Sequence, residues 1–290
     1  DSSTGVIRVA NVTVDREEKD AYRLIVVATD HGTTPLSGSA TVNILIDDVN
    51  DCSPEFVNPI QTVSILESAG VGTIVAEVTA IDRDLNPRLE YYIIEIVATD
   101  DTNVIVPNQQ GTFSVDFKTG AVMVKSPLNR ELVATYDITV SVYDNASEVV
   151  DRSVSVPNAK LTVNILDVND NTPRFRPFGV TVFSQRIIEG ATPGTTLLSV
   201  SAVDPDKGPN GQITYSLYNL VPAGYVQLED NTAGKIIANR TVDYEQVQWV
   251  NFTVRASDNG SPQRSSDVPV RLEIVDINDN NPIFSQTLYQ

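Results

Sequence analysis

One short acidic motif occurs three times along the chain and divides it at regular intervals. The copies occupy residues 48–54, 167–173 and 276–282, and each combines aspartate and asparagine with a closing proline. Successive copies are 119 and 109 residues apart. Self-similarity at a fixed period is typical of repeat proteins, in which each repeat is one folding unit. The chain is therefore expected to fold as a row of similar domains.

Other acidic motifs recur in a constant order inside each repeat. Asp15-Arg16-Glu17 returns as residues 129–131 and 243–245, and a single aspartate returns at positions 30, 144 and 258. A glutamate at position 67 or 189 is followed 15 residues later by an Asp-x-Asp pair. We expect half a repeat at residues 1–52, complete repeats at 53–171 and 172–280, and the start of another at 281–290. The chain then reads as a window on a longer array.

Between the motifs, apolar and polar residues alternate. Residues 136–142, 161–166 and 268–274 show this pattern and are rich in β-branched side chains, which indicates strands with one buried face. Turn residues separate them at short intervals, and no segment keeps a helical stripe for three turns. About seven short strands in each repeat predict a Greek-key β-sandwich, although the Cys-Trp-Cys core of immunoglobulin domains is missing.

Composition narrows the chemistry that the chain can perform. It carries 38 acidic and 20 basic side chains, a net charge of −18, which would repel a nucleic-acid backbone. Hydrophobic residues make up 41%, but no run approaches the ~20 residues that span a bilayer. The chain has one cysteine and one histidine. These are too few for a disulfide framework or a Cys/His zinc site, and they offer little for a catalytic pair of a nucleophile and a histidine. Oxygen ligands are abundant.

The acidic residues gather where two repeats join. Carboxylates ~4 Å apart repel by about 4 kcal/mol per pair at an effective dielectric constant near 20, so such a cluster is unfavourable unless a cation fills it. Ca²⁺ accepts six to eight oxygen ligands in flexible geometry. The sequence therefore predicts calcium sites at the repeat junctions.

These motifs, in this order and across essentially the whole chain, resemble the extracellular cadherin repeat. The resemblance is to long non-classical cadherins of the tip-link or Fat and Dachsous type. It implies an all-β chain of tandem seven-stranded, Ig-like Greek-key sandwiches joined by linkers that each bind several Ca²⁺ ions. It also implies an extracellular, cell-surface adhesion protein that is no enzyme, with other cadherin chains as homophilic or heterophilic partners and a membrane anchor elsewhere in the parent protein.

The resemblance assigns ligands to each linker, residue by residue. The first linker would use Asp15, Glu17, Asp48, Asn50, Asp51, the Cys52 carbonyl, Asp82, Asp84 and Asp144. The central linker would use Glu67, Asn129, Glu131, Asp167, Asn169, Asp170, the Asn171 carbonyl, Asp204, Asp206, a carbonyl near Asn210, and Asp258. The third would use Glu189, Asp243, Glu245, Asp276, Asn278, Asp279 and Asn280.

Four features of the sequence depart from the family pattern, and not all of them cost a ligand. Asn129 replaces an aspartate, which removes one charge and should weaken the outermost site of the central linker. Residues 85–88 replace a Gly-x-Asn-Gly loop, so this loop should follow a different path. The third linker lacks ligands from a following repeat and should be partly occupied by calcium. Asp30 should have no cluster of other calcium ligands around it. Cys52 replaces an asparagine and is either an inert free thiol or a partner in an intermolecular disulfide.

Other interpretations of these residues fit the sequence less well. Residues 204–215 begin like an EF-hand loop but end in Tyr215 where a glutamate is required. Paired acids could serve a glycosidase, but these recur in every repeat, whereas an active site is normally assembled once. Trp249 lies deep inside a repeat and is expected to be a core or cross-strand residue rather than an exchanged one. Sequons at Asn11, Asn145, Asn239 and Asn251 are compatible with a cell-surface chain.

Two functions remain open. In the first, Ca²⁺ stiffens the linkers of an extracellular rod that spans a gap and bears load. In the second, one repeat face recognises a partner chain and calcium only supports the scaffold. The insertion at residues 98–111, absent from the following repeat, is the candidate surface for the second function.

Overall fold

The structure, a computed structural model, describes residues 3–10, 13–145 and 158–286. The chain forms two compact units, one of Asp1–Leu128 with Val133–Ile165 and one of Asn129–Leu132 with Leu166–Gln290. Every regular element in the described residues is a strand, apart from a 3₁₀ turn η1 at Gly208–Gly211. The predicted all-β fold is confirmed.

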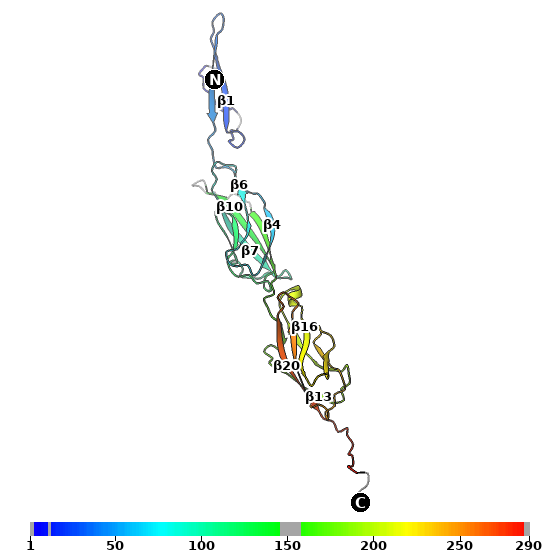
Figure 1. Cartoon of the computed structure of the whole chain (residues 1–290). Coiled ribbons are helices and arrows are strands. Elements are labelled where there is room, and N and C mark those ends of the chain that lie inside the picture. Colours follow the sequence, from blue (N-terminus) through cyan, green and yellow to red (C-terminus); the bar gives the residue numbers. More distant parts are fainter. Residues whose placement is uncertain (1–2, 11–12, 146–157, 287–290) are drawn as a thin grey trace. The chain divides into compact units, whose positions relative to one another are not determined.

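The first unit begins with an antiparallel hairpin, drawn in blue in Figure 1. It joins β1 (Ala21–Thr29) to β2 (Ser37–Leu45), with Ala21 opposite Leu45 and Thr29 opposite Ser37. Several of its apolar side chains are exposed, among them Ile25 and Val27. Within residues 3–10 and 13–52, β1 and β2 are the two strands that the structure describes.

A β-sandwich follows in the same unit. Its four-stranded sheet has the order β4-β11-β10-β7, its three-stranded sheet has the order β5-β9-β8, and β3 pairs with β6. The strands are β3 (Glu55–Phe56), β4 (Ile60–Leu66), β5 (Ile74–Glu77), β6 (Ala80–Ile81), β7 (Leu89–Thr99), β8 (Phe113–Val115), β9 (Ala121–Val124), β10 (Thr135–Asp144) and β11 (Asn158–Leu166).

The second unit contains a sandwich with the same plan. Its sheets have the orders β13-β20-β19-β16 and β14-β18-β17, and β12 pairs with β15. Strand β13 runs parallel to β20, whereas β19 is antiparallel to both of its neighbours. The strands are β12 (Arg174–Arg176), β13 (Phe183–Ile188), β14 (Thr196–Ser199), β15 (Ser201–Val203), β16 (Thr214–Val221), β17 (Val226–Leu228), β18 (Lys235–Ala238), β19 (Trp249–Ser257) and β20 (Ser265–Val275).

The alternating segments of the sequence form the central strands. Residues 136–142 lie in β10, 161–166 in β11 and 268–274 in β20, so all three predicted strands are confirmed. Buried residues alternate with partly or fully exposed ones along β11 and β20 and along β10 as far as Val140, because successive side chains of a strand point to opposite faces. Beyond that point in β10, Ser141 is buried as well. Period two therefore places one row of each strand in the core.

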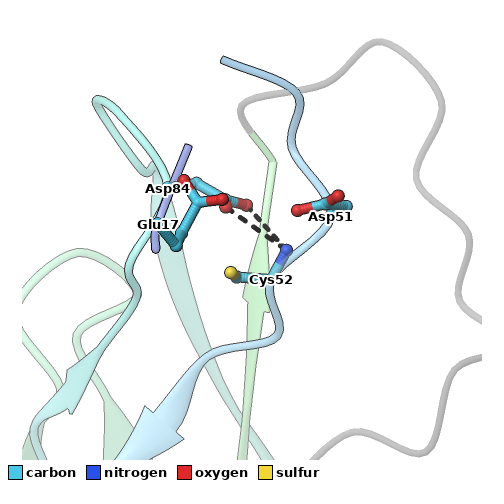
Figure 2. A group of neighbouring side chains, drawn as sticks. All are labelled: Glu17, Asp51, Cys52 and Asp84. Carbon is cyan, nitrogen blue, oxygen red and sulfur yellow. Dashed lines mark hydrogen bonds between the residues drawn. The ribbon is translucent and has the colours of Figure 1, made fainter. Parts of the chain in front are cut away.

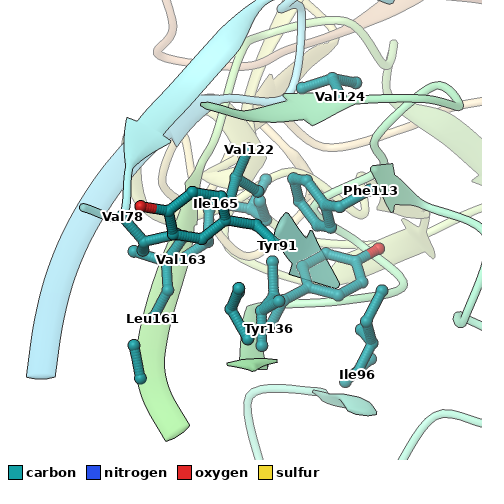
Figure 3. Packing of buried hydrophobic residues seen from close by; sticks show 14 of the residues in the cluster. Val78, Tyr91, Ile96, Phe113, Val122, Val124, Tyr136, Leu161, Val163 and Ile165 are labelled. Carbon is teal, nitrogen blue, oxygen red and sulfur yellow. The ribbon is translucent and has the colours of Figure 1, made fainter. Parts of the chain in front are cut away.

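Each sandwich has its own apolar core between its sheets. In the first, Ile138, Leu161 and Val163 are fully buried, and the ring of Phe113 meets that of Tyr136 edge-on with centroids 5.0 Å apart. Figure 3 shows Leu161, Val163, Phe113 and Tyr136 among the side chains that converge from the facing strands. Each fully buried aliphatic side chain contributes about 1.5–3 kcal/mol. The cores hold rigid the strand ends from which the acidic residues project.

Candidate metal centres in the linkers

The Asp-x-Asp pairs follow directly on two equivalent short strands. Asp204 comes after β15, whose Ala202 N–H donates to the Tyr215 hydroxyl at 2.8 Å. The equivalent bond in the first sandwich joins Ala80 N–H to the Tyr91 hydroxyl at 3.0 Å, just before Asp82. Each tyrosine is also part of the core. A buried aromatic residue therefore fixes the strand from which the acidic pair emerges.

The first linker brings together carboxylates from three segments. Oxygens of Glu17, Asp51 and Asp84, with the sulfur of Cys52, lie within 4.8 Å of one another. Figure 2 shows Glu17 beside Asp84, with the main chain of Cys52 bonded to Asp84. That bond runs from the Cys52 N–H to an Asp84 oxygen at 3.0 Å. Three segments that are separated in the sequence thus each supply an acid.

A second group of the same linker lies deeper in the sandwich. Oxygens of Asp82, Asp84 and Asp144 lie within 4.8 Å of one another. The Asp84 N–H donates to one oxygen of Asp82 at 2.9 Å, and the Arg88 N–H donates to Asp144 at 2.7 Å. Asp84, only 5% exposed, belongs to both groups. It is therefore the residue that joins them.

The second unit repeats this arrangement. Oxygens of Glu131, Asp167 and Asp206 lie within 4.8 Å of one another. The Asn171 N–H donates to Asp206 at 3.1 Å, as the Cys52 N–H does to Asp84 in the first unit. The side chain of Asn171 adds a bond to Asp206 at 2.6 Å, which cysteine cannot reproduce. The main-chain hydrogen bond to the aspartate is therefore present with either cysteine or asparagine at this position.

Two loops close over the second cluster. The Asn210 side-chain amide donates to Asp167 at 2.8 Å, and the Asn169 amide donates to the Pro262 carbonyl at 2.7 Å. Asp258 is fully buried, and its carboxylate accepts the N–H groups of Gly260 and Arg264 at 3.0 and 3.1 Å. These bonds fix the orientation of the predicted ligands.

The equivalent loops of the two sandwiches differ, as the sequence predicts. In the second unit, residues 208–211 form η1, and a Cβ at Gly211 would lie 2.0 Å from the Asp206 carbonyl oxygen. In the first, the chain bends through Asn86, which has a positive φ of 60°. Only glycine permits the close approach seen at Gly211.

Several buried oxygens of these clusters have no hydrogen-bond donor. Asp82 Oδ2, Asp167 Oδ1, Asn169 Oδ1 and Asp204 Oδ2 are in this state among the described residues. A buried acceptor without a partner costs about 1–3 kcal/mol, and more when charged. The donor set is all oxygen, apart from one sulfur. These orphaned oxygens fit a hard divalent cation such as Ca²⁺.

The electrostatics of the Asp-x-Asp pairs agree with this requirement. Burial raises the pKa of Asp82, and the neighbouring carboxylates Asp84 and Asp144 raise it further. Burial likewise raises the pKa of Asp204, with contributions from Asp206, Asp258 and Asp167. Each rise means that the charged form is disfavoured without a counter-charge. A bound cation would supply that charge.

The third set of predicted ligands is only partly assembled. Glu189, Asp243 and Glu245 have oxygens within 4.8 Å of one another. Glu189 is buried and accepts the N–H groups of Tyr244 and Ile277, both at 2.7 Å. The remaining predicted ligands are exposed and belong to no such group in the described chain. They are Asp276, Asn278, Asp279 and Asn280.

Other predicted residues serve local turns. Asp15 accepts the N–H of Glu17 at 2.8 Å, and Asn129 accepts that of Leu132 at 2.8 Å. Asp30 accepts the N–H of Gly32 at 3.1 Å and belongs to none of the acidic groups in the described chain. Four further predicted ligands take the following positions. Glu67 is buried after β4, Asp170 is exposed and accepts the Asn171 amide, Asn50 is exposed, and Asp48 is partly buried.

The sequence reasoning did not foresee the role of Arg16. Its Nε donates to Asp48 at 2.5 Å, its guanidinium pairs with Glu17, and it also donates to the Arg83 carbonyl at 2.9 Å. Two predicted calcium ligands are therefore held by an internal cation. The Asp-Arg-Glu motif contained the signal, because it places a positive charge between two predicted ligands.

The sequence also singled out Trp249, which lies outside the clusters, and the thiol of Cys52 in the first cluster. Trp249 is a cross-strand residue, because the Arg271 guanidinium of β20 lies 3.6 Å from the centroid of its ring. The thiol of Cys52 is free, and hydrogen bonding to Asp84, with burial, raises its pKa to about 12. An intermolecular disulfide at this cysteine stays a prediction.

Comparison with known families gives one consistent match. The family described as "Cadherin domain" matches residues 1–47, 61–166 and 183–275. Human Cadherin-23 is 71% identical over 287 residues, which cover 99% of this chain and 9% of that protein. The chain therefore spans about a tenth of the length of this relative.

Solved structures agree with the sequence comparison. The crystal structure of human CDH23 EC21-23 is 70% identical and has a TM-score of 0.76, covering 81% of this chain and 73% of that one. A cis-dimer structure of protocadherin gammaB7 EC3-6 is 26% identical with a TM-score of 0.76, covering 91% of this chain and 61% of that one. In the described residues, no helix is long and apolar enough to cross a membrane.

Proposed function

The chain belongs to the cadherin family, and on this premise we propose that it is a segment of an extracellular rod whose linkers are stiffened by Ca²⁺. Cadherins are adhesion proteins rather than enzymes, so the prediction of a non-enzymatic role is confirmed. Cadherin domains bind calcium. The load-bearing role, the number of ions and the ligand assignment are our proposals, as is a cell-surface location of the parent protein.

The observation that carries the proposal is the composition of the first acidic group. Glu17 comes from the half-repeat, Asp51 from the linker and Asp84 from the following repeat, yet their oxygens lie within 4.8 Å. An ion held by all three would join segments that otherwise repel. Glu131 and Asp206 make the equivalent combination in the second unit.

The bound ion would supply positive charge among the carboxylates, and the side chains and carbonyl groups of the linkers would hold it in place. The first linker would be held by Glu17, Asp51, Asp82, Asp84 and Asp144, together with Asp15, Asp48, Asn50 and the Cys52 carbonyl. The central linker would be held by Glu131, Asp167, Asn169, Asp204, Asp206 and Asp258, together with Glu67, Asn129, Asp170, Asn171 and Asn210. At the 10⁻⁴–10⁻³ M affinity of extracellular modules, 2 mM Ca²⁺ would stabilise the fold by about 0.7–1.8 kcal/mol per ion.

Thermal unfolding and small-angle scattering test this proposal. The protein is compared in 2 mM-scale Ca²⁺, in Mg²⁺ and in chelator. We expect Ca²⁺ alone to raise the melting temperature and to extend the particle. Asp84→Asn should abolish much of this response because Asp84 serves two groups, whereas the exposed Glu77→Gln in the same sandwich should preserve it. Equal stability and equal shape in all three solutions would refute the proposal.

A partner-recognition role is supported by the insertion at residues 98–111. Asp100 accepts the N–H groups of Thr102 and Val104 at 2.8 and 2.9 Å, so hydrogen bonds within the loop define its conformation. It exposes Val104 and Ile105 beside a pocket of about 290 Å³. We propose another cadherin chain as the partner. Val104→Asp should lower self-association in sedimentation experiments if that partner is a second copy, and unchanged association contradicts it.

A further inference from the structure

Two of the four sequons can be compared in the structure. Asn239-Arg240-Thr241 and Asn251-Phe252-Thr253 lie entirely within the described residues. The first two residues of the sequon at Asn11 and the last two residues of the one at Asn145 lie outside them. Both comparable asparagines are exposed. Exposure alone does not separate them, but their hydrogen bonding and neighbours do.

Asn251 lies on the solvent face of a central strand. In β19, Val250 and Phe252 are buried, so Asn251 and Thr253 point away from the core together with Trp249. Asn251 is exposed, and no hydrogen bond to its side chain is found among the described residues. Its amide nitrogen is therefore available and has room around it.

The surroundings of Asn251 suit a sugar. Residues two apart on a strand are ~7 Å apart and project to the same side, so the Trp249 indole stands beside Asn251. Arg271, directly opposite Asn251 in the ladder, lies with its guanidinium 3.6 Å from the indole centroid. An aromatic face attracts the weakly positive C–H groups of a sugar ring as it attracts a cation. On the other side, Val221 is 63% exposed and leaves space.

Asn239 has a different environment. Its Nδ2 donates to the Gly224 carbonyl at 3.1 Å, and the neighbouring Arg240 Nε donates to the same oxygen at 3.1 Å. The Arg240 guanidinium also stacks on the Tyr225 ring at 4.7 Å. The nitrogen that would carry a glycan is thus part of the turn that joins these segments.

We propose that Asn251 carries an N-linked glycan whose first N-acetylglucosamine packs on the Trp249–Arg271 pair. Asn251 Nδ2 bonds to C1 of a lipid-pyrophosphate-linked oligosaccharide. The bond from C1 to the pyrophosphate oxygen breaks, the lipid pyrophosphate leaves with that electron pair, and Nδ2 loses one proton to solvent. The inference rests on the extracellular setting of the proposed function, because this donor is met in the secretory pathway.

Site occupancy is the first test. The fragment is secreted from a mammalian line behind a heterologous signal sequence and is mapped by mass spectrometry after enzymatic deglycosylation in ¹⁸O water. We expect Asn251 to be occupied in most molecules and Asn239 in a minority. Thr253→Val should remove one glycan while keeping Asn251 and Trp249, and Thr241→Val is the matched change at the other sequon. An unmodified Asn251, or an Asn239 occupied as fully, overturns the assignment.

The packing is tested by fluorescence, because Trp249 is the only tryptophan of the chain. We expect the secreted protein, trimmed to a single N-acetylglucosamine, to emit at a shorter wavelength than Thr253→Val and to be quenched less by acrylamide. Identical spectra and quenching overturn the packing. Both tests are run with Ca²⁺ and with chelator, so a failure to bind calcium is recorded separately from a failure to carry the glycan.

Discussion

Gly260 offers a sharp test of how the central cluster is organised. A Cβ at this position would lie 2.3 Å from Asn169 Nδ2 and 2.5 Å from Asn210 Oδ1. Gly260 has no positive φ, so alanine meets no backbone strain, and the collision with the two side chains is the whole perturbation. Gly260→Ala should therefore push Asn169 away from the Pro262 carbonyl and out of the cluster.

The size of the effect follows from the bond that is lost. Asn169 is 5% exposed and holds Pro262 through one hydrogen bond of 2.7 Å, and such a bond contributes about 0.5–1.5 kcal/mol. At 1.4 kcal/mol for each factor of ten, calcium affinity at the central linker should fall about 2- to 12-fold. The melting temperature in chelator should fall slightly.

Calorimetric titration of chelator-treated protein with Ca²⁺ measures this change. Gly111→Ala is the control, because that glycine has no positive φ and a Cβ there would meet nothing within 4 Å. Its titration should match the parent protein. If Gly260→Ala also matches the parent, Asn169 does not hold the cluster together and the reasoning is refuted.

Three further changes test the turn, the internal cation and a surface pair. Asp258→Ala should destabilise the protein in chelator by about 1–3 kcal/mol, because the N–H groups of Gly260 and Arg264 would lose their acceptor; Asp30→Ala, at the exposed equivalent, should lose less, and equal losses in thermal unfolding would contradict this. Arg16→Met should strengthen calcium binding at the first linker a few-fold in calorimetry, since the guanidinium no longer competes for Glu17 and Asp48; weaker binding would show that Arg16 positions these ligands instead. The Arg255 side chain bonds to Asp267 at 2.8 Å and lowers its pKa. This stabilisation is present above the unfolded pKa near 3.9 and is lost as pH falls through the lower folded value. Asp267→Asn should therefore cost a few tenths of a kcal/mol in urea unfolding at pH 7 and progressively less as the pH falls below the unfolded value. A pH-independent cost would exclude the pair.

Much of the fold could be predicted because the sandwiches obey local rules. Alternation identified β10, β11 and β20, whose inward rows are buried almost completely. The interruption between β5 and β6 could not be predicted, because it depends on which strand each piece pairs with: β5 bonds to β9 and β6 to β3. Pairing partners are tertiary information, and a one-dimensional pattern does not contain them.

The candidate site divides in the same way. The recurrence of acids identified Glu17, Asp51 and Asp84, which lie together, because a linker motif constrains which segments meet. The recurrence did not show that Arg16 would bond to Asp48, because a long, flexible side chain can reach many different partners. The sequence likewise shows that position 129 lacks the negative charge of an aspartate. It does not show which atom of the Asn129 side chain faces the cluster.

The position of Asn129 leads to a prediction of gained function. Asp15, Asn129 and Asp243 each use Oδ1 to accept the N–H groups of the turn that follows. An aspartate retains a second oxygen for a cation, whereas the single side-chain oxygen of Asn129 must serve both the turn and the ion, because its amide nitrogen is a donor. Asn129→Asp should therefore keep the turn and raise calcium affinity at the central linker. Calorimetric titration against Asn108→Asp, an equal charge change on the exposed loop of the insertion, separates a new ligand from a general increase in negative charge. Equal gains in the two variants would mean that position 129 supplies no ligand.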